Sequence, residues 1–145
     1  WAAQQDDYPV TVQTGHSISE LILSPREILF TGVTRPDALV LISEEGLKKA
    51  ARHLGSLTKG NWLFTTPPFA GIETAAQKVV FDLEASGVRG GRRNLGLLLI
   101  AAALRRLDLF PIAACEEAAR LGLHGALRDE VLETLAASAT LVAGG

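Results

Sequence analysis

Apolar and polar positions follow two different periods along the chain, and the change divides it into two halves. In the first half, runs rich in β-branched and other apolar residues occupy 10–12, 18–23 and 28–30, with proline and glycine between them. Runs of this length and composition predict β-strands that pair antiparallel across turns. The continuous apolar run at 38–42 predicts a strand that is covered on both faces.

A helix is expected directly after this run. Ser43 is a good N-cap, and Glu44 and Glu45 would lie in the first turn, where the helix dipole favours carboxylates. Apolar residues at helical spacing continue to Leu54, and a glycine follows. The residues 61–65 then predict a returning strand, so this part of the chain has β-α-β order.

Helical periodicity dominates the second half. A short strand is expected at 78–81, one helix from Arg92 onward, a second beginning at Pro111 and a third over 129–141. No repeat or linker divides the chain. The pattern predicts one domain, residues 1–145, of the α/β class: a three-layer α/β/α sandwich with a mixed sheet and a helical C-terminal layer.

The composition fits a soluble domain without a strongly charged partner. Of the 145 residues, 48% are hydrophobic, and the formal net charge is -2. This balance argues against nucleic acid or an anionic membrane surface as a partner. The apolar run at 95–104 is about half the ~20 residues that a membrane span requires. No secretion signal is visible, so a cytoplasmic location is expected.

Metal binding is not expected from this chain. One thiol, Cys115, cannot form an internal disulfide or hold a zinc ion or an iron–sulfur cluster. The histidines His16, His53 and His124 lack metal-ligand spacing, and His53 is expected near a helix C-terminus, where the dipole suits it. Cys115 adjoins an apolar stripe, which favours a small buried hydrophobe, with a reactive thiol as the alternative.

Two short segments are candidates for binding. Gly15, His16 and Ser17 form a polar corner between two expected strands, where glycine permits close approach of a ligand or another chain. The same residues also suit a turn for purely local reasons. No common catalytic motif occurs in the sequence, so no catalytic residue is assigned.

The second candidate places three arginines around two glycines at the start of an apolar helix. Its members are Arg89, Arg92, Arg93 and the following Asn94. Unpaired N–H groups at a helix start, together with guanidinium groups, suit a phosphate or a carboxylate. Alternatively, the glycines permit a bend and the arginines keep the start of the helix soluble.

Passages in this order resemble the γ-type subunit or domain of the 2-oxoacid:ferredoxin oxidoreductases, the pyruvate and ketoisovalerate oxidoreductase group. Residues 6–24 are similar to the family's strand, glycine-bearing corner and returning strand. Residues 35–46, with Pro-Asp before the apolar run and Ser-Glu-Glu after it, are similar to its strand-to-helix passage. Residues 93–98 and 109–118 are similar to its asparagine-containing helix and the helix after it.

The sequence departs from the family pattern in two ways. Members commonly open with a strand and a glycine-rich turn into a helix, and this unit is missing here. The resemblance therefore implies a domain truncated at its N-terminus. Many members also carry an arginine at the corner where this chain has Thr14, so no anion-binding role is carried over to Thr14.

The resemblance implies a component of an assembly that oxidatively decarboxylates a 2-oxoacid to acyl-CoA and CO2 and passes electrons to ferredoxin. Thiamine diphosphate and 4Fe-4S clusters would be held by thiamine-diphosphate and ferredoxin-like subunits or domains, and the isolated chain would be inactive. This chain would lie on the substrate and coenzyme A side of its partners, and it could form a homodimer. The residues expected there are Gly15, His16, Ser17, Arg89, Arg92, Arg93 and Asn94.

Two other classes of function fit the same sequence. One is a non-catalytic interaction or regulatory α/β domain that has kept the scaffold without oxidoreductase partners. The other, more weakly supported, is a nucleotide-binding α/β module.

Overall fold

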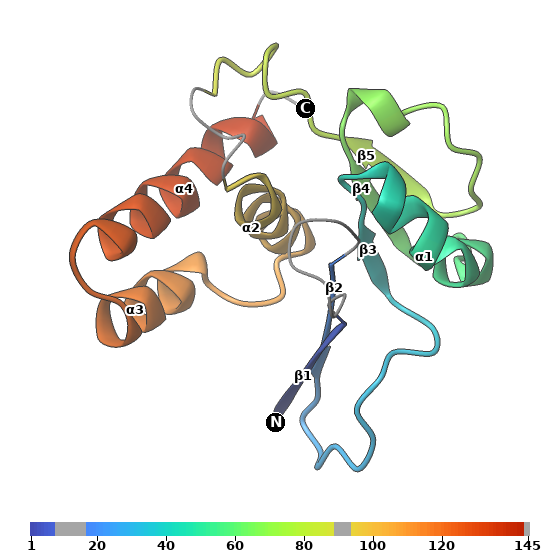
Figure 1. Ribbon diagram of the computed structural model, residues 1–145, viewed down its shortest axis with the longest axis horizontal. Helices are drawn as coiled ribbons and strands as arrows, with labels where there is room; N and C mark the ends of the chain where they lie inside the picture. The colour runs from blue at the N-terminus through green and yellow to red at the C-terminus, as the bar shows by residue number, and fades with distance from the viewer. Residues whose placement is uncertain (8–16, 89–93, 144–145) are drawn as a thin grey trace.

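A parallel sheet of three strands forms the centre of the fold, with helices on both of its faces (Figure 1). The computed structural model describes residues 1–7, 17–88 and 94–143. The central sheet has the order β3-β4-β5, and β1 and β2 form a separate antiparallel pair. The strands are β1 (Ala2–Asp7), β2 (Ile18–Leu23), β3 (Ala38–Val40), β4 (Trp62–Thr65) and β5 (Gln77–Val80). The helices are α1 (Glu44–Ser56), the 3-10 turn η1 (Pro67–Phe69), α2 (Leu95–Leu107), α3 (Ile112–Gly122) and α4 (Gly125–Ala143).

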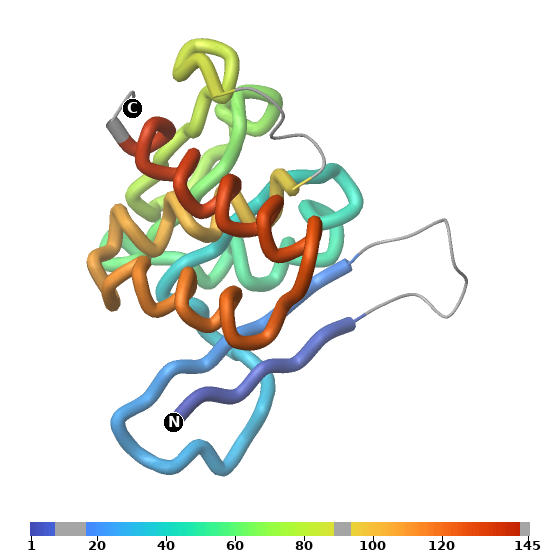
Figure 2. Tube along the Cα trace, turned by 90° about the vertical axis from the view of Figure 1, so that its left-hand side faces the viewer, coloured from blue at the N-terminus to red at the C-terminus, as the bar shows by residue number. Residues whose placement is uncertain are grey.

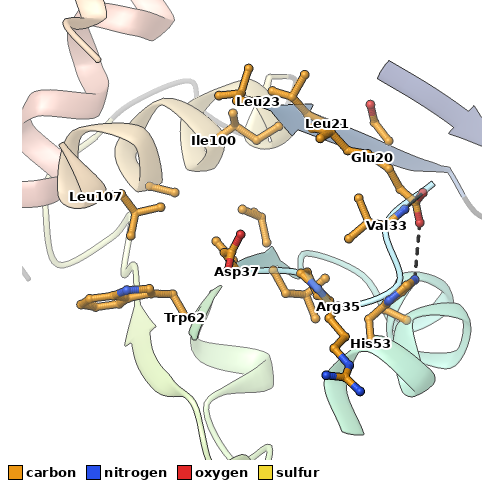
Figure 3. A pocket seen from close by; sticks show the side chains of 18 of the residues that line it. Glu20, Leu21, Leu23, Val33, Arg35, Asp37, His53, Trp62, Ile100 and Leu107 are labelled. Atoms are coloured by element: carbon orange, nitrogen blue, oxygen red, sulfur yellow. Dashed lines mark hydrogen bonds and ion pairs between the residues drawn. The ribbon is translucent and has the colours of Figure 1, made fainter. Parts of the chain in front are cut away.

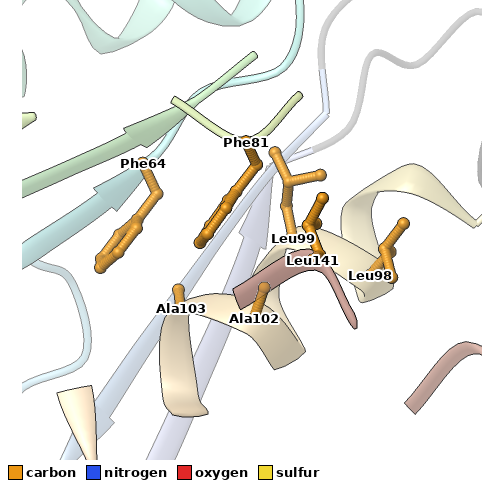
Figure 4. Packing of buried hydrophobic residues seen from close by; sticks show 7 residues of the cluster. All are labelled: Phe64, Phe81, Leu98, Leu99, Ala102, Ala103 and Leu141. Atoms are coloured by element: carbon orange, nitrogen blue, oxygen red, sulfur yellow. The ribbon is translucent and has the colours of Figure 1, made fainter. Parts of the chain in front are cut away.

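Strand β4 lies between two hydrophobic cores because its successive side chains point to opposite faces. Leu63 packs with Leu41 and Leu57 beneath α1. Phe64 packs with Phe81 and with the apolar face of α2 (Figure 4). The expected α/β/α layering is therefore present around the central sheet, and the α/β class is confirmed.

Helix α1 begins where the sequence predicts. Ser43 Oγ accepts a hydrogen bond from the N–H of Gly46 at 3.0 Å, and Glu44 and Glu45 lie in the first turn. The strand before this cap, β3, pairs in parallel with β4, the strand that follows the helix. The expected β-α-β order is confirmed.

Polar side chains hold α4 against α2 at two places. Asn94 Nδ2 donates to Glu130 Oε1 at 2.9 Å and to Thr134 Oγ1 at 3.3 Å. Further along both helices, Arg105 Nε donates to Ser138 Oγ at 2.7 Å. Helix α3 lies between α2 and α4 in the chain, so the expected helical C-terminal layer is present.

The strands do not form the single mixed sheet that the sequence predicts. β1 and β2 make their own antiparallel ribbon, in which Ala2 lies opposite Leu23 and Asp7 opposite Ile18 (Figure 2). Within the described ranges, no strand joins this ribbon to β3. The sequence also missed β1, whose alanines and aspartates are poor strand formers. Pairing with β2, rather than local propensity, makes this segment a strand.

The prediction of a strand at 28–30 is wrong. These residues belong to no sheet, and the side chains of Leu29 and Phe30 are 80% and 83% exposed. Strand propensity reflects fit to a pleated, half-buried surface, and no neighbouring strand supplies one here. The strand expected at 10–12 lies outside the described residues.

The N-cap of α1 gives a first prediction. We expect Ser43→Ala to lower the free energy of unfolding by about 1 kcal/mol, because the N–H of Gly46 loses its acceptor. Ser43→Asn, which keeps a capping oxygen, is the matched control and should stay within a few tenths of a kcal/mol of the unchanged protein. Urea unfolding followed by circular dichroism measures both. Equal losses in the two variants would contradict a capping role.

Candidate functional site

A cavity of about 800 Å³ separates β2 from the central sheet, and we call it the β2–β3 cleft (Figure 3). β2 lines one side and β3 the other. Segment 32–37 also borders the cleft, and α2 contributes Ile100, Ala103, Leu104 and Leu107. The cleft is therefore enclosed by elements from both sheets and from the helical layer.

Apolar side chains at this cleft remain open to solvent. Leu21 and Leu23 of β2 are 53% and 47% exposed, and Ile100 of α2, which lies near them in Figure 3, is 45% exposed. Leu109, which follows α2 and also lines the cleft, is 58% exposed. Grouped apolar exposure of this kind is typical of surfaces that bind a ligand or a protein segment.

One polar cluster lies at the border of the cleft and connects three elements. Glu20 Oε2, from β2, accepts a hydrogen bond from the N–H of Val33 at 2.8 Å. Glu20 Oε1 lies 3.4 Å from Nε2 of His53, in the last turn of α1. His53 Nδ1 is buried without a hydrogen-bond partner among the described residues. The Glu20 carboxylate thus links the ribbon to α1 and to segment 32–37.

Sequence reasoning placed His53 near the C-terminus of a helix, which is confirmed, but it missed Glu20 as its partner. The two residues are far apart in the sequence and on elements of different type. No local spacing signal could have paired them, because their contact depends on how the ribbon packs against α1.

The structure describes only two of the seven residues predicted for the site. Ser17 is exposed just before β2. Asn94 is half-buried at the start of α2 and hydrogen-bonded to α4. Neither of them lines the β2–β3 cleft. The other predicted residues, Gly15, His16, Arg89, Arg92 and Arg93, lie outside the described residues.

Cys115 is half-buried in α3, so the sequence overestimated its burial. Burial, and secondarily the carboxylate of Glu116, raise the pKa of its thiol above the ordinary value of 9.0. A raised pKa reduces the fraction of thiolate at neutral pH, and the thiolate is the nucleophilic form. We therefore expect this thiol to react more slowly at neutral pH than a cysteine whose pKa is not raised.

No group of three or more metal-ligating side chains comes together in the part of the chain that the structure describes. Of the helices in these ranges, none combines the length and apolar character needed to cross a lipid bilayer. The sequence matches no protein-family model and no curated protein.

The contact between Glu20 and Val33 gives a second prediction. We expect Glu20→Ala to speed hydrogen exchange of the Val33 amide roughly tenfold, because the amide loses its acceptor. Glu20→Gln is the matched control: it removes the charge but keeps a carbonyl oxygen, and most of the protection should remain. The measurement is amide exchange by NMR. An unchanged Val33 rate in the alanine variant would show that the bond does not hold segment 32–37.

The Cys115 thiol gives a third prediction. At pH 8.5 we expect iodoacetamide to alkylate Cys115 more slowly than it alkylates the cysteine of an unstructured peptide, because the raised pKa leaves less thiolate. Glu116→Gln removes a negative charge, lowers the pKa and should speed alkylation by roughly two- to threefold. Glu117→Gln is the control and should change nothing. Mass spectrometry of timed samples gives the rates, and equal rates in both variants would refute the effect of Glu116.

Proposed function

We propose that this chain is the γ-type component of a cytoplasmic 2-oxoacid:ferredoxin oxidoreductase. The assembly oxidatively decarboxylates a 2-oxoacid to acyl-CoA and CO2 and passes the electrons to ferredoxin. Thiamine diphosphate and 4Fe-4S clusters belong to partner subunits or domains. This chain contributes scaffold on the substrate and coenzyme A side and is inactive alone.

The main support is the passage over residues 35–46, one of the three parts of the chain that carry the sequence resemblance. Its apolar run contains β3, and Ser43 caps α1 directly afterwards. A strand that passes at once into a capped helix is the local structure that the resemblance implies. The helix after Asn94 and the helix after Pro111 also occur in the implied order, as α2 and α3.

On this proposal, the corner Gly15-His16-Ser17 and the segment from Arg89 to Asn94 face the partners or coenzyme A. Arginine guanidinium groups are suited to the phosphates of coenzyme A because they bind phosphate oxygens in a bidentate manner. The corner would contribute a close backbone approach through its glycine. These roles come from the sequence alone.

A fourth prediction tests membership of the complex. A tagged copy of the natural protein, expressed in its own cells, should co-purify with a thiamine-diphosphate subunit and an iron–sulfur subunit. The purified material should reduce a viologen dye only when a 2-oxoacid and coenzyme A are both present. A protein that purifies without these subunits, or with subunits of another function, would favour the interaction or regulatory domain instead.

The proposed contact between the segment from Arg89 to Asn94 and coenzyme A is tested in the same complex. The double variant Arg92→Gln/Arg93→Gln should raise the KM for coenzyme A about tenfold, which corresponds to the loss of about 1.4 kcal/mol of binding. Arg128→Gln is the matched control, since Arg128 is an exposed arginine of α4 that pairs with Asp129. Normal assembly with an unchanged KM for coenzyme A would remove these two arginines from the coenzyme A side.

A further inference from the structure

The connection from β2 to β3 runs over residues 24–37 without a helix or a strand. Irregular connections of this length are uncommon in compact domains, and they usually have a function of their own. We call residues 25–31 the strap. In Figure 1 the strap extends away from the central sheet, so its position is not explained by packing in the core.

Both ends of the strap are anchored on the ribbon. Before the strap, Ser24 N–H donates to Trp1 O at 3.1 Å, so Ser24 continues the ladder between β2 and β1. After the strap, Val33 N–H donates to Glu20 Oε2 at 2.8 Å. Gly32 lies between the strap and this second anchor, and its φ of 114° is a backbone conformation that favours glycine. The strap can therefore turn as a unit about its two anchors while both bonds remain.

Few contacts hold the strap in its observed position. The N–H of Arg26 donates to Ser24 Oγ at 3.0 Å, but residues 27–31 form no hydrogen bond or ion pair with any other described residue. Leu29 and Phe30 are the two most exposed large apolar side chains in the described part of the chain. A compact surface loop is normally packed by its own side chains. The apolar end of this strap lacks such packing.

The strap is attached at the rim of the β2–β3 cleft. Leu23, the last residue of β2, and Gly32, which follows the strap, both line the cleft. Phe30 is close to Gly32 in the chain, since two residues span at most about 7 Å. The cleft has exposed apolar side chains of its own, Leu21 and Leu23 on β2 and Ile100 on α2. An exposed apolar strap and an exposed apolar cleft thus lie within reach of each other.

We infer that the strap closes over the β2–β3 cleft and inserts Leu29 and Phe30 into it. There the two side chains contact Leu21, Leu23 and Ile100, and closure is driven by the removal of apolar surface from water on both sides. The described conformation is the open state. In the closed state the strap fills the apolar part of the cleft, so a molecule that binds there has to displace it. This inference does not depend on the proposed function.

Two segments outside the described residues are poorer candidates for this apolar part of the cleft. Residues 89–93, Arg-Gly-Gly-Arg-Arg, contain no apolar side chain. Residues 8–16 join the ribbon at Asp7 and Ser17, at the end of β2 that is farther from Leu23. A strand rises about 3.4 Å per residue, so this junction lies roughly 20 Å along β2 from Leu23. The strap, in contrast, begins at the Leu23 end of the strand.

A fifth prediction measures the competition between the strap and an apolar probe, the dye anilinonaphthalene sulfonate. In the natural protein, Leu29→Ser/Phe30→Ser should tighten binding of the dye about threefold, because a strap that fills the cleft about two-thirds of the time triples the Kd. Without closure, this double variant only removes exposed apolar surface, which would leave binding unchanged or weaken it. Fluorescence titration measures the Kd. Unchanged or weaker binding would overturn the inference.

Two further variants locate this effect. Leu121→Ser/Leu127→Ser removes exposed leucines of α3 and α4 that do not line the cleft, and it should not tighten binding of the dye. Ile100→Ser, added to the strap variant, should abolish the gain, because it removes part of the apolar wall of the cleft. A gain that persists after Ile100→Ser would place the dye elsewhere and contradict closure over this cleft.

Cross-linking identifies what occupies the cleft. A photoreactive amino acid placed at Ile100 in the natural protein should capture the strap, and the product should keep the mass of one chain. The same amino acid placed at Leu127 is the control and should not capture the strap. Capture at Ile100 of residues 8–16, of residues 89–93 or of a segment outside residues 1–145, in place of the strap, would overturn the inference. A product with the mass of two chains would indicate the strap of a second copy and overturn it as well.

Discussion

Strand β4 has no face that can be left to solvent, and the rest of the packing follows from this constraint. Leu63 and Phe64 are neighbours with 0% exposure on opposite faces, so a helix must cover each side of the strand. On the α2 side, Phe64 stacks with Trp62 and with Phe81, each at a centroid distance of 5.8 Å. On the other side Leu63 needs α1. The positions of both helices are therefore set by one four-residue strand.

The same helix that completes this core also creates the exposed apolar surface. Leu99 of α2 is fully buried, but Ile100, the next residue, lines the β2–β3 cleft and is 45% exposed. Arg106, near the end of α2, lies over the Trp62 ring at 5.6 Å, a cation–π contact that helps to hold this end of the helix above the start of β4. The side of α2 that carries Ile100, Leu104 and Leu107 therefore becomes an apolar wall of the β2–β3 cleft.

The sequence predicts those parts of the fold that have a local cause. Ser43 and the apolar run before it were sufficient to predict β3 and α1, and the helical layer follows from apolar spacing. β1 was missed because its pairing with β2, not its composition, makes it a strand. The contact between Glu20 and His53 depends on long-range packing, and so does the division into two sheets. Neither could be predicted from a local pattern in the sequence. The predicted binding residues other than Ser17 and Asn94 lie outside the described part of the chain.

The contacts of Asn94 limit which groups in the segment from Arg89 to Asn94 can bind an anion. Its amide nitrogen has two hydrogens, and both are donated to α4, to Glu130 and Thr134. Only the carbonyl oxygen of this side chain is left for other contacts, and an oxygen acceptor cannot bind an anion. Asn94 also makes no side-chain cap for α2, so the N–H groups of the first turn keep their capacity to donate. An anion held at this end of α2 would therefore be bound by arginines and backbone N–H groups, with Asn94 holding the helix in place against α4.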